Sequence, residues 1–277
     1  MPQPVATTSY NAANQQTVFG AQTVTYDNNG NLTSDGINAY GWNARNQLVS
    51  MSGPALAATF QYDVFGRRIS KTINSAMTSF LYDGVKVAQE QTESGNTSIV
   101  AGGIYEVFTR TDSISTVSPI GDRLGSAAAL SDSTGAIQTQ YTYEPFGKTA
   151  ASGPSNGNTS QYTGRENDGT GLYYYRARYY SPALQRFISE DPIGFDGGDV
   201  NLFAYVANQP TMVTDPFGLQ HPYEQITHNA SKMGPLPLSG RSCEDSSNPD
   251  VKKIYDTYRT KVDELTRKGL QIGRAHV

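Results

Sequence analysis

The stretch Tyr62-Asp63-Val64-Phe65-Gly66-Arg67-Arg68-Ile69 contains the phrase that decides the fold. Before it, Ala58–Tyr62 alternates between apolar and polar residues, which is the period of a half-buried strand. Asp accepts a hydrogen bond from a nearby backbone N–H group, and glycine adopts a positive φ at no steric cost. The phrase therefore predicts a strand, a tight turn and a second strand.

Related phrases recur along the chain. They are Tyr26-Asp27-Asn28-Asn29-Gly30-Asn31-Leu32, Tyr143-Glu144-Pro145-Phe146-Gly147-Lys148, the shorter Tyr82-Asp83-Gly84, and the Asn-rich stretches Tyr10–Gln15 and Trp42–Leu48. Their spacing is irregular, at about 20–40 residues, as in stacked supersecondary units. The sequence therefore predicts a mainly β protein of antiparallel hairpins in one curved, spiralling sheet.

The composition narrows the class of protein. The 277 residues carry a formal net charge of −4 and only 17% charged residues, which argues against nucleic-acid binding by the β body. Eighteen Tyr and one Trp indicate a half-exposed β surface, on which Tyr keeps its hydroxyl in water. The single cysteine, Cys243, excludes an internal disulfide. No signal peptide and no apolar run of about 18 residues are visible, so we expect no membrane span.

A doubled tetrapeptide marks a change in composition near the end of the chain. Asp191-Pro192-Ile193-Gly194 recurs as Asp215-Pro216-Phe217-Gly218, and Leu219 follows the second copy at once. Each copy is by itself good turn chemistry and indicates only local structure. After Leu219 the sequence becomes charged and helix-like, so the junction is a candidate functional site.

The Tyr-Asp phrases resemble the YD repeats of RHS proteins. The ordered set from Asp122 to Leu219 resembles the RHS repeat-associated core domain; it comprises residues 122–126, 143–147, 162–166, 172–180 and the two Asp-Pro-x-Gly turns. We therefore divide the chain into a YD-repeat β region at residues 1–120, a core domain at 121–219 and a variable C-terminal segment at 220–277.

The resemblance implies a hollow β shell that encloses a C-terminal toxic domain and is cut from it after Leu219, at the Leu219–Gln220 bond. It also implies catalytic roles for Asp191, Asp215 and Arg178. Two carboxylates can hydrolyse a peptide bond when one is ionised and activates water while the other is protonated and donates. The chain is thus expected to be at most a single-turnover aspartyl autoprotease, with no cofactor and no metal.

The same resemblance implies the partners and the location of the protein. The partners are its own C-terminal toxin segment, an immunity protein and a secretion apparatus used in competition between bacteria. The protein would be secreted or delivered to the cell surface. The alternatives are a non-cleaving structural or adhesive YD-repeat surface protein that binds carbohydrate or a partner, and an inactive remnant.

Neighbouring residues leave the site assignment open. Arg178 lies in a Tyr-rich stretch and could serve only to stack on Tyr175 or Tyr179. Side chains of the same types as the candidates lie nearby: Arg176, Arg186, Glu190 and Asp196. These acids lie outside the repeated motif, whereas either arginine could replace Arg178.

The segment from 220 to 277 predicts one amphipathic helix over residues 249–269, with Asn248 as N-cap and Pro249 at its first position. The spacing of His221, His228 and Cys243 fits no metal-ligand pattern. The ending at residues 272–277 resembles a translated sequencing-adapter read-through. We therefore expect a fragment of a longer protein with a truncated toxin segment.

Overall fold

The structure, a computed structural model, describes residues 7–102 and 106–219. Within these ranges the predicted mainly β fold is confirmed, and the helical segments there are three short 3₁₀ turns. In the described ranges no helix is long and apolar enough to span a membrane. The helix expected at residues 249–269 and the residue Gln220 lie outside the described residues.

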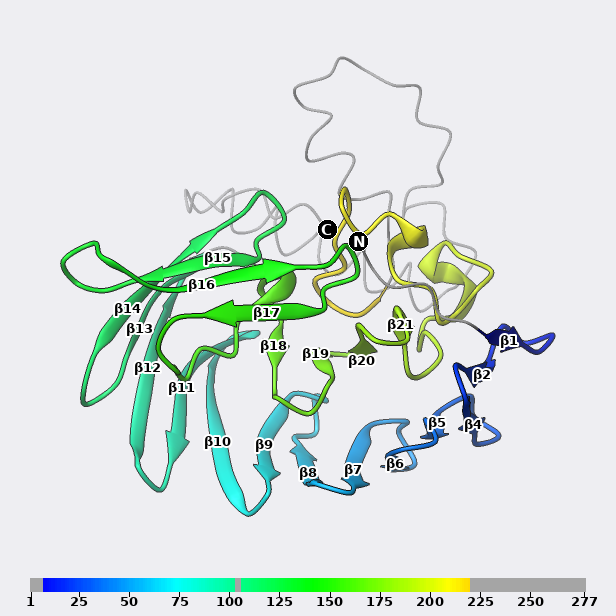
Figure 1. The fold of residues 1–277 in the computed structure, drawn as a ribbon. Coiled ribbons are helices and arrows are strands. Elements are labelled where there is room, and N and C mark those ends of the chain that lie inside the picture. Colours follow the sequence, from blue (N-terminus) through cyan, green and yellow to red (C-terminus); the bar gives the residue numbers. More distant parts are fainter. Residues whose placement is uncertain (1–6, 103–105, 220–277) are drawn as a thin grey trace, which may run out of the picture. The chain divides into compact units, whose positions relative to one another are not determined.

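The largest sheet contains 14 strands that follow one another in chain order (Figure 1). Each strand pairs with the next in antiparallel fashion, so the predicted run of hairpins is confirmed, while its spiral course stays a prediction. The strands are β4 (Thr25–Tyr26), β5 (Leu32–Ser34), β6 (Ala39–Trp42), β7 (Leu48–Gly53), β8 (Leu56–Tyr62), β9 (Arg68–Ile73), β10 (Ala76–Asp83), β11 (Lys86–Thr92), β12 (Gly95–Ala101), β13 (Val107–Thr111), β14 (Thr116–Gly121), β15 (Ala127–Ser131), β16 (Ile137–Tyr143) and β17 (Thr149–Ser152).

Two smaller sheets accompany the large one. The first contains β1 (Thr8–Tyr10), β2 (Gln16–Phe19) and β3 (Gln22–Thr23), and the second contains β18 (Glu166–Asn167), β19 (Tyr173–Tyr175), β20 (Arg178–Ser181) and β21 (Arg186–Phe187). The 3₁₀ turns are η1 (Tyr162–Gly164), η2 (Gly194–Gly197) and η3 (Val206–Asn208).

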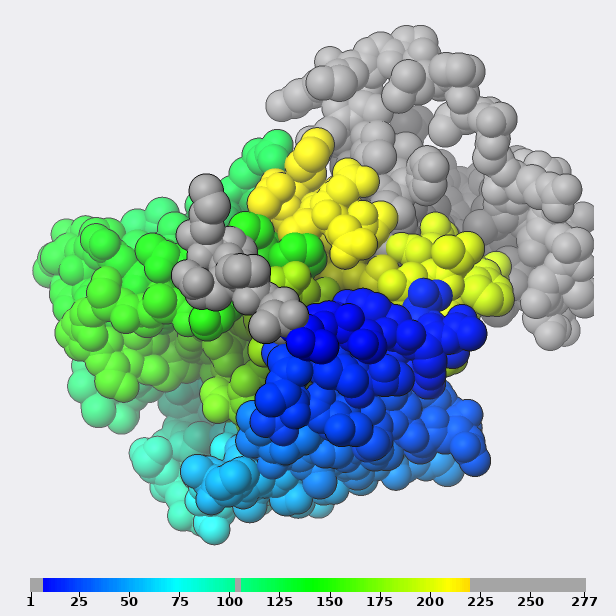
Figure 2. Space-filling view, turned by 45° about the vertical axis from the view of Figure 1, so that its right-hand side comes forward, coloured from blue at the N-terminus to red at the C-terminus, as the bar shows by residue number. Residues whose placement is uncertain are grey.

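The N-terminal strands lie against the segment that follows β21 (Figure 2, blue beside yellow-green). The Leu32 N–H donates to the Ile188 carbonyl at 2.9 Å. Tyr26 packs edge-on against Phe203, with ring centroids 5.6 Å apart. Residues separated by more than 150 positions in the sequence therefore share one packed region.

The recurring phrase forms the same loop at the copies that begin with Asp27, Asn43 and Asp63. In the turn between β8 and β9, Asp63 Oδ1 accepts the N–H groups of Phe65 and Arg67, each at 2.9 Å. Gly66 has φ +83° and donates its N–H to the Asp63 carbonyl. Asn43 makes the equivalent bonds in the turn between β6 and β7. The Asx oxygen and the positive φ explain why these turns begin with Asp or Asn and end with Gly or Asn.

Successive turns are joined by cationic side chains. Each donates to a backbone carbonyl of the next turn along the sheet: Arg45 to Val64, Arg67 to Gly84 and Lys86 to Gly102. Side-chain amides extend the series on one side, where Asn29 donates to Asn46. This ladder holds the ends of neighbouring hairpins together outside the strand pairing.

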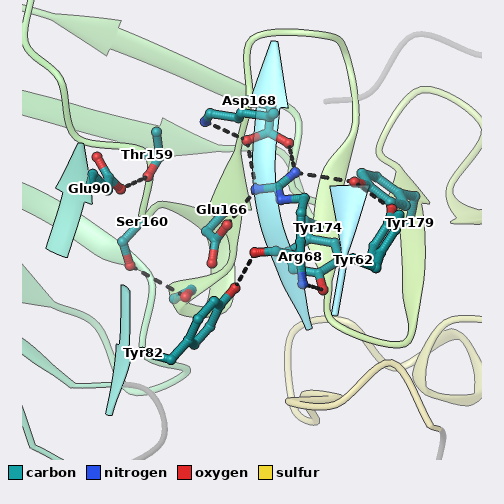
Figure 3. Close-up of polar contacts among 12 residues, drawn as sticks. Tyr62, Arg68, Tyr82, Glu90, Thr159, Ser160, Glu166, Asp168, Tyr174 and Tyr179 are labelled. Atoms are coloured by element: carbon teal, nitrogen blue, oxygen red, sulfur yellow. Dashed lines mark hydrogen bonds and ion pairs between the residues drawn. The ribbon is translucent and has the colours of Figure 1, made fainter. Parts of the chain in front are cut away.

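A buried ion cluster joins β9 of the large sheet to β18 and the residue after it (Figure 3). Arg68 on β9 has 0% exposure and forms ion pairs with Asp168 and, at 2.5 Å, with Glu166. Lys71 reaches the other oxygen of Asp168 at 2.8 Å. The Arg68 guanidinium also lies 4.2 Å above the ring of Tyr174. Because the side chains of Arg68 and Asp168 are out of water, each charge depends on its partners.

The segment from Gly157 to Asp168 follows the same face across further strands. Arg110 on β13 pairs with Glu90 on β11 at 2.8 Å and donates to the Gly157 carbonyl at 2.9 Å. Thr159 donates to Glu90 at 3.4 Å. Polar contacts therefore hold this segment to β13, β11 and β9 in turn.

The expectation of a half-exposed tyrosine surface is wrong for much of the core. Nine tyrosines of the described chain are buried: Tyr40, Tyr141, Tyr162, Tyr173, Tyr174, Tyr175, Tyr179, Tyr180 and Tyr205. Their hydroxyls bond within the protein; Tyr180, for example, donates to the Phe146 carbonyl at 2.9 Å. Internal partners make this burial possible, since a buried hydroxyl without one is costly.

Replacing Asp168 with Asn should destabilise the fold by about 3–5 kcal/mol, because Arg68 and Lys71 then keep buried charges without their counter-ion. Burial by itself would raise the pKa of Asp168, but Arg68 and Lys71 outweigh it and hold the pKa below its usual range. The stability that ionised Asp168 contributes is fully present above a pH of about 4, and it is lost as the pH falls through the lowered pKa.

Denaturant unfolding at several pH values checks this. The matched control is Asp63→Asn, which keeps the turn oxygen and loses only a partly exposed pair with Arg67. Equal stability of the Asp168→Asn protein and the wild type at pH 7 would contradict the prediction.

Candidate functional site

The two Asp-Pro-x-Gly turns meet at one arginine. Arg178, at the start of β20, places Nη2 2.9 Å from Asp191 Oδ2 and 3.5 Å from Asp215 Oδ2. The three residues are 2%, 6% and 3% exposed. The structure therefore brings together all three side chains that the sequence singled out.

The remaining donors of Arg178 fix the guanidinium plane. Nε donates to the Gly218 carbonyl at 2.5 Å and Nη1 donates to the Leu202 carbonyl at 2.9 Å. The ring of Phe187 lies 3.6 Å from the guanidinium carbon. A planar fork can make these contacts at once, whereas a lysine ammonium cannot.

Asp215 has the geometry of a repeat-turn Asp. Its Oδ1 accepts the N–H groups of Phe217 at 3.2 Å and Leu219 at 3.0 Å, as Asp63 does in its own turn. Its Oδ2 faces Arg178. One oxygen of Asp215 thus closes the turn, and the other remains directed at the cation.

Asp191 repeats part of this arrangement. Its Oδ1 accepts the Ile193 N–H at 3.1 Å, and its carbonyl accepts the Gly194 N–H at 2.9 Å. Its own N–H donates to the Leu202 carbonyl, which Arg178 also contacts. Turn chemistry and convergence on Arg178 therefore coexist at both aspartates.

Burial sets the electrostatics of the site. Desolvation raises the pKa of Asp215, opposed by Arg178 and by the two backbone N–H groups and reinforced by the charge of Asp191. Desolvation also lowers the pKa of Arg178 to about 10, although both carboxylates oppose this. The two buried carboxylates therefore share the charge of Arg178.

The neighbouring candidates have other partners. Arg186 donates to Asn201 at 3.3 Å, and Arg176 donates to the Pro216 carbonyl at 2.8 Å. Glu190 lies so close to Gly30 that a Cβ there would be 2.4 Å from its carboxylate. Asp196 is exposed in η2. Arg178 lies between the two carboxylates, and its aromatic contact is Phe187 rather than Tyr175 or Tyr179.

Three contributors were missed from the sequence. Phe187 and the Leu202 carbonyl carry no local signal, because neither lies in a turn phrase. Arg165 donates to the Pro216 carbonyl at 3.0 Å, and its place in the motif Tyr162–Glu166 was the one available hint. Among the described residues, no group of three or more His, Cys, Asp or Glu side chains lies close enough to hold a metal ion.

A cavity of about 380 Å³ opens beside Leu219. Its wall includes Arg176 and Leu219 and the repeat turns that carry Arg45, Arg67 and Lys86. Leu219 is half-buried at this wall. The first residue of the expected scissile bond thus lines the cavity, and Gln220 lies outside the described residues.

The family model of the Teneurin YD-shell matches residues 3–214. The chain belongs to the YD-shell family. Among curated relatives, this YD-shell chain is 37% identical over 224 residues to "tRNA nuclease WapA" of Bacillus subtilis (strain 168), covering 76% of the chain and 10% of the relative. It is 29% identical over 215 residues to "Double-stranded DNA deaminase toxin A" of Burkholderia cenocepacia, covering 65% of the chain and 14% of the relative.

Solved structures share the fold of this YD-shell chain. A crystal structure of TcdB2-TccC3-TEV has a TM-score of 0.57 at 21% identity, covering 77% of the chain and 13% of the other. A Photorhabdus luminescens Tc holotoxin pore has a TM-score of 0.54 at 23% identity, covering 73% and 10%. The YD-shell chain spans about a tenth of the length of WapA.

The two glycines of the doubled motif should respond differently to alanine. At Gly218 a Cβ would lie 2.4 Å from the Tyr175 carbonyl oxygen and 3.0 Å from the Arg178 nitrogen, whereas at Gly194 nothing lies within 4 Å. Both have positive φ, +69° and +59°. Gly194→Ala should therefore cost about 1–2 kcal/mol for the backbone alone, and Gly218→Ala clearly more.

Denaturant unfolding of the two variants side by side measures the difference. The cost of the positive φ is common to both variants. Any additional loss of unfolding free energy in Gly218→Ala therefore reports the backbone contact with β19 and β20. Equal losses would contradict the close approach of the second turn to Arg178.

Proposed function

We propose that this YD-shell chain is the self-cleaving end of a toxin-carrying shell protein, which cuts itself after Leu219 and releases its C-terminal segment. One observation carries the proposal: Arg178 contacts both carboxylates and the Gly218 carbonyl, one residue before the bond to be cut. The toxin and nuclease names of the relatives fit this class of protein.

In the proposed reaction Asp191 is ionised and Asp215 is protonated. Asp191 takes a proton from a water molecule while the water oxygen attacks the Leu219 carbonyl carbon. Asp215 then gives its proton to the Gln220 nitrogen as the C–N bond breaks. The products are a Leu219 carboxylate and a Gln220 amine, with one water consumed.

The surroundings of the two carboxylates support this assignment of the acid and base roles. Burial raises the pKa of Asp215, which favours the role of acid. Asp191 makes the shorter ion pair with Arg178, 2.9 Å against 3.5 Å, which favours the role of base. Two carboxylates with different surroundings divide the acid and base roles, as in other carboxylate pairs.

Arg178 has two tasks in this proposal. It neutralises the ionised carboxylate, and its Nε holds the Gly218 carbonyl so that the next peptide bond has a fixed position. Because the substrate is part of the same chain, orientation alone can lower the barrier by about 7–11 kcal/mol. A slow reaction that occurs once per molecule is sufficient.

The β body serves as the container in this proposal. The hairpins, joined by the ladder of turn contacts, enclose the C-terminal toxin segment until it is released. The protein is secreted or delivered to the cell surface, and its partners are the toxin segment, an immunity protein and a secretion apparatus. The chemistry of the toxin belongs to the residues after Leu219.

Asp191→Asn and Asp215→Asn should each abolish cleavage while the fold survives, because an amide keeps the turn oxygen but cannot exchange a proton in the same way. Intact-mass analysis of the natural protein, with any flanking sequence, should find a wild-type fragment ending at Leu219 and another beginning at Gln220. Asp196→Asn, an exposed neighbour, is the matched control and should be cut normally. A folded wild-type protein that stays at full length would contradict self-cleavage and favour the non-cleaving structural or adhesive alternative.

Arg178→Lys should slow cleavage at least about tenfold, or ~1.4 kcal/mol in barrier, although the charge is kept. The reason is that one ammonium cannot hold two carboxylates and the Gly218 carbonyl together. The time course of the full-length mass after refolding gives the rate. A wild-type rate in this variant would show that charge alone is sufficient.

A further inference from the structure

Three consecutive carbonyls before Leu219 are each bound by the hairpin between β19 and β20 or by a neighbouring arginine. The carbonyls and their donors are Pro216 with Arg176 Nη1 at 2.8 Å and Arg165 Nη1 at 3.0 Å, Phe217 with the Ala177 N–H at 3.0 Å, and Gly218 with Arg178 Nε at 2.5 Å. Residues 176, 177 and 178 therefore donate, in the same order, to the carbonyls of residues 216, 217 and 218.

Side-chain packing supports the same register. The ring of Phe217 lies 4.9 Å from the guanidinium carbon of Arg176. Gly218 approaches the backbone of Tyr175 and Arg178 so closely that it has no room for a Cβ. The strip Pro216–Gly218 is thus fixed by its backbone, by a ring contact and by the absence of a side chain.

Arg176 occupies a position where the backbone favours a different residue. Its φ is +62°, a left-handed conformation in which glycine or asparagine is the usual choice and most other residues cost about 1 kcal/mol. Such an outlier points to a role for the side chain. That side chain contacts the Pro216 carbonyl and the Phe217 ring.

We propose that the Tyr175–Arg178 turn and Arg165 form the substrate-binding site of the cleavage reaction, which holds the strip Pro216–Gly218. Arg165 and Arg176 are positioning residues that select the bond to be cut. This rests on the proposed self-cleavage after Leu219. A slip of one residue would move the strip by about 3.3 Å and present a different peptide bond to the two aspartates. Two charge-assisted bonds to one carbonyl oppose that slip.

The same contacts act after the cut. The donors to residues 216–218 are unchanged by hydrolysis, and the Leu219 N–H still bonds to Asp215. The new chain end therefore stays in the site and occupies it. This accounts for a reaction that proceeds once per molecule, and it makes the end of the first fragment resistant to carboxypeptidase.

The first test measures cleavage in the natural protein carrying Arg165→Gln, Arg176→Gln or both. The double variant should cut at least about tenfold more slowly, with masses from cuts at neighbouring bonds, and Arg176→Lys should restore part of the rate. The pH profile of the residual rate should keep its wild-type shape, because the aspartate pair is untouched. Arg45→Gln, whose side chain donates to a repeat turn instead, should cut normally. A double variant that cuts only after Leu219 at the wild-type rate would overturn the proposal.

The second test does not depend on cleavage. In the Asp191→Asn background, hydrogen exchange of the Phe217 and Leu219 amides should be much faster when both arginines are replaced by Gln, and unchanged with Arg45→Gln. Equal exchange would overturn binding of the strip by these arginines. If the wild type is never cut but exchange is faster in the variant that lacks both arginines, self-cleavage is wrong and the binding of the strip by these arginines is still supported.

Discussion

The buried pairing of Arg68 with Asp168 is the interaction on which the arrangement of this protein depends. A guanidinium and a carboxylate that are both out of water require each other, and Glu166 and Lys71 complete the balance of charge. The pairing fixes β18 and the loop after it against β9. Since β18 leads into β19 and β20, it also fixes the hairpin that carries Arg178.

The candidate site is built from the same turn as the repeats. Asp63 and Asp215 both use Oδ1 to bind the N–H groups two and four residues later. They differ in what meets the second oxygen: Asp63 faces Arg67 of its own turn, partly exposed, whereas Asp215 faces a buried Arg178 from another strand. A structural loop acquires an unusual carboxylate through its surroundings alone, because burial raises the pKa of Asp215.

The packing around the site also explains the tyrosine-rich core. Tyr175 and Tyr180 pack edge-on against Phe187, the ring that contacts Arg178, and Tyr175 also packs edge-on against Tyr205. The hydroxyl of Tyr175 bonds to that of Tyr205 at 3.1 Å. These aromatic contacts hold the hairpin rigid while each hydroxyl keeps a partner. Rigid support of this kind is what a proposed acid–base pair needs to keep its geometry.

The sequence by itself determined the hairpins, their turns and the two aspartates of the candidate site. Local chemistry is sufficient for this: Asp63 and Gly66 close a turn with bonds inside five residues, and the doubled Asp-Pro-x-Gly motif singles out Asp191 and Asp215. Only the tertiary structure decided that Arg178 and not Arg186 lies between them, that Phe187 and Leu202 support it, and that Arg68 is buried against Asp168. Such contacts join residues 9 to 100 positions apart. No local pattern encodes them, because packing of several strands together determines which side chains lose water and meet.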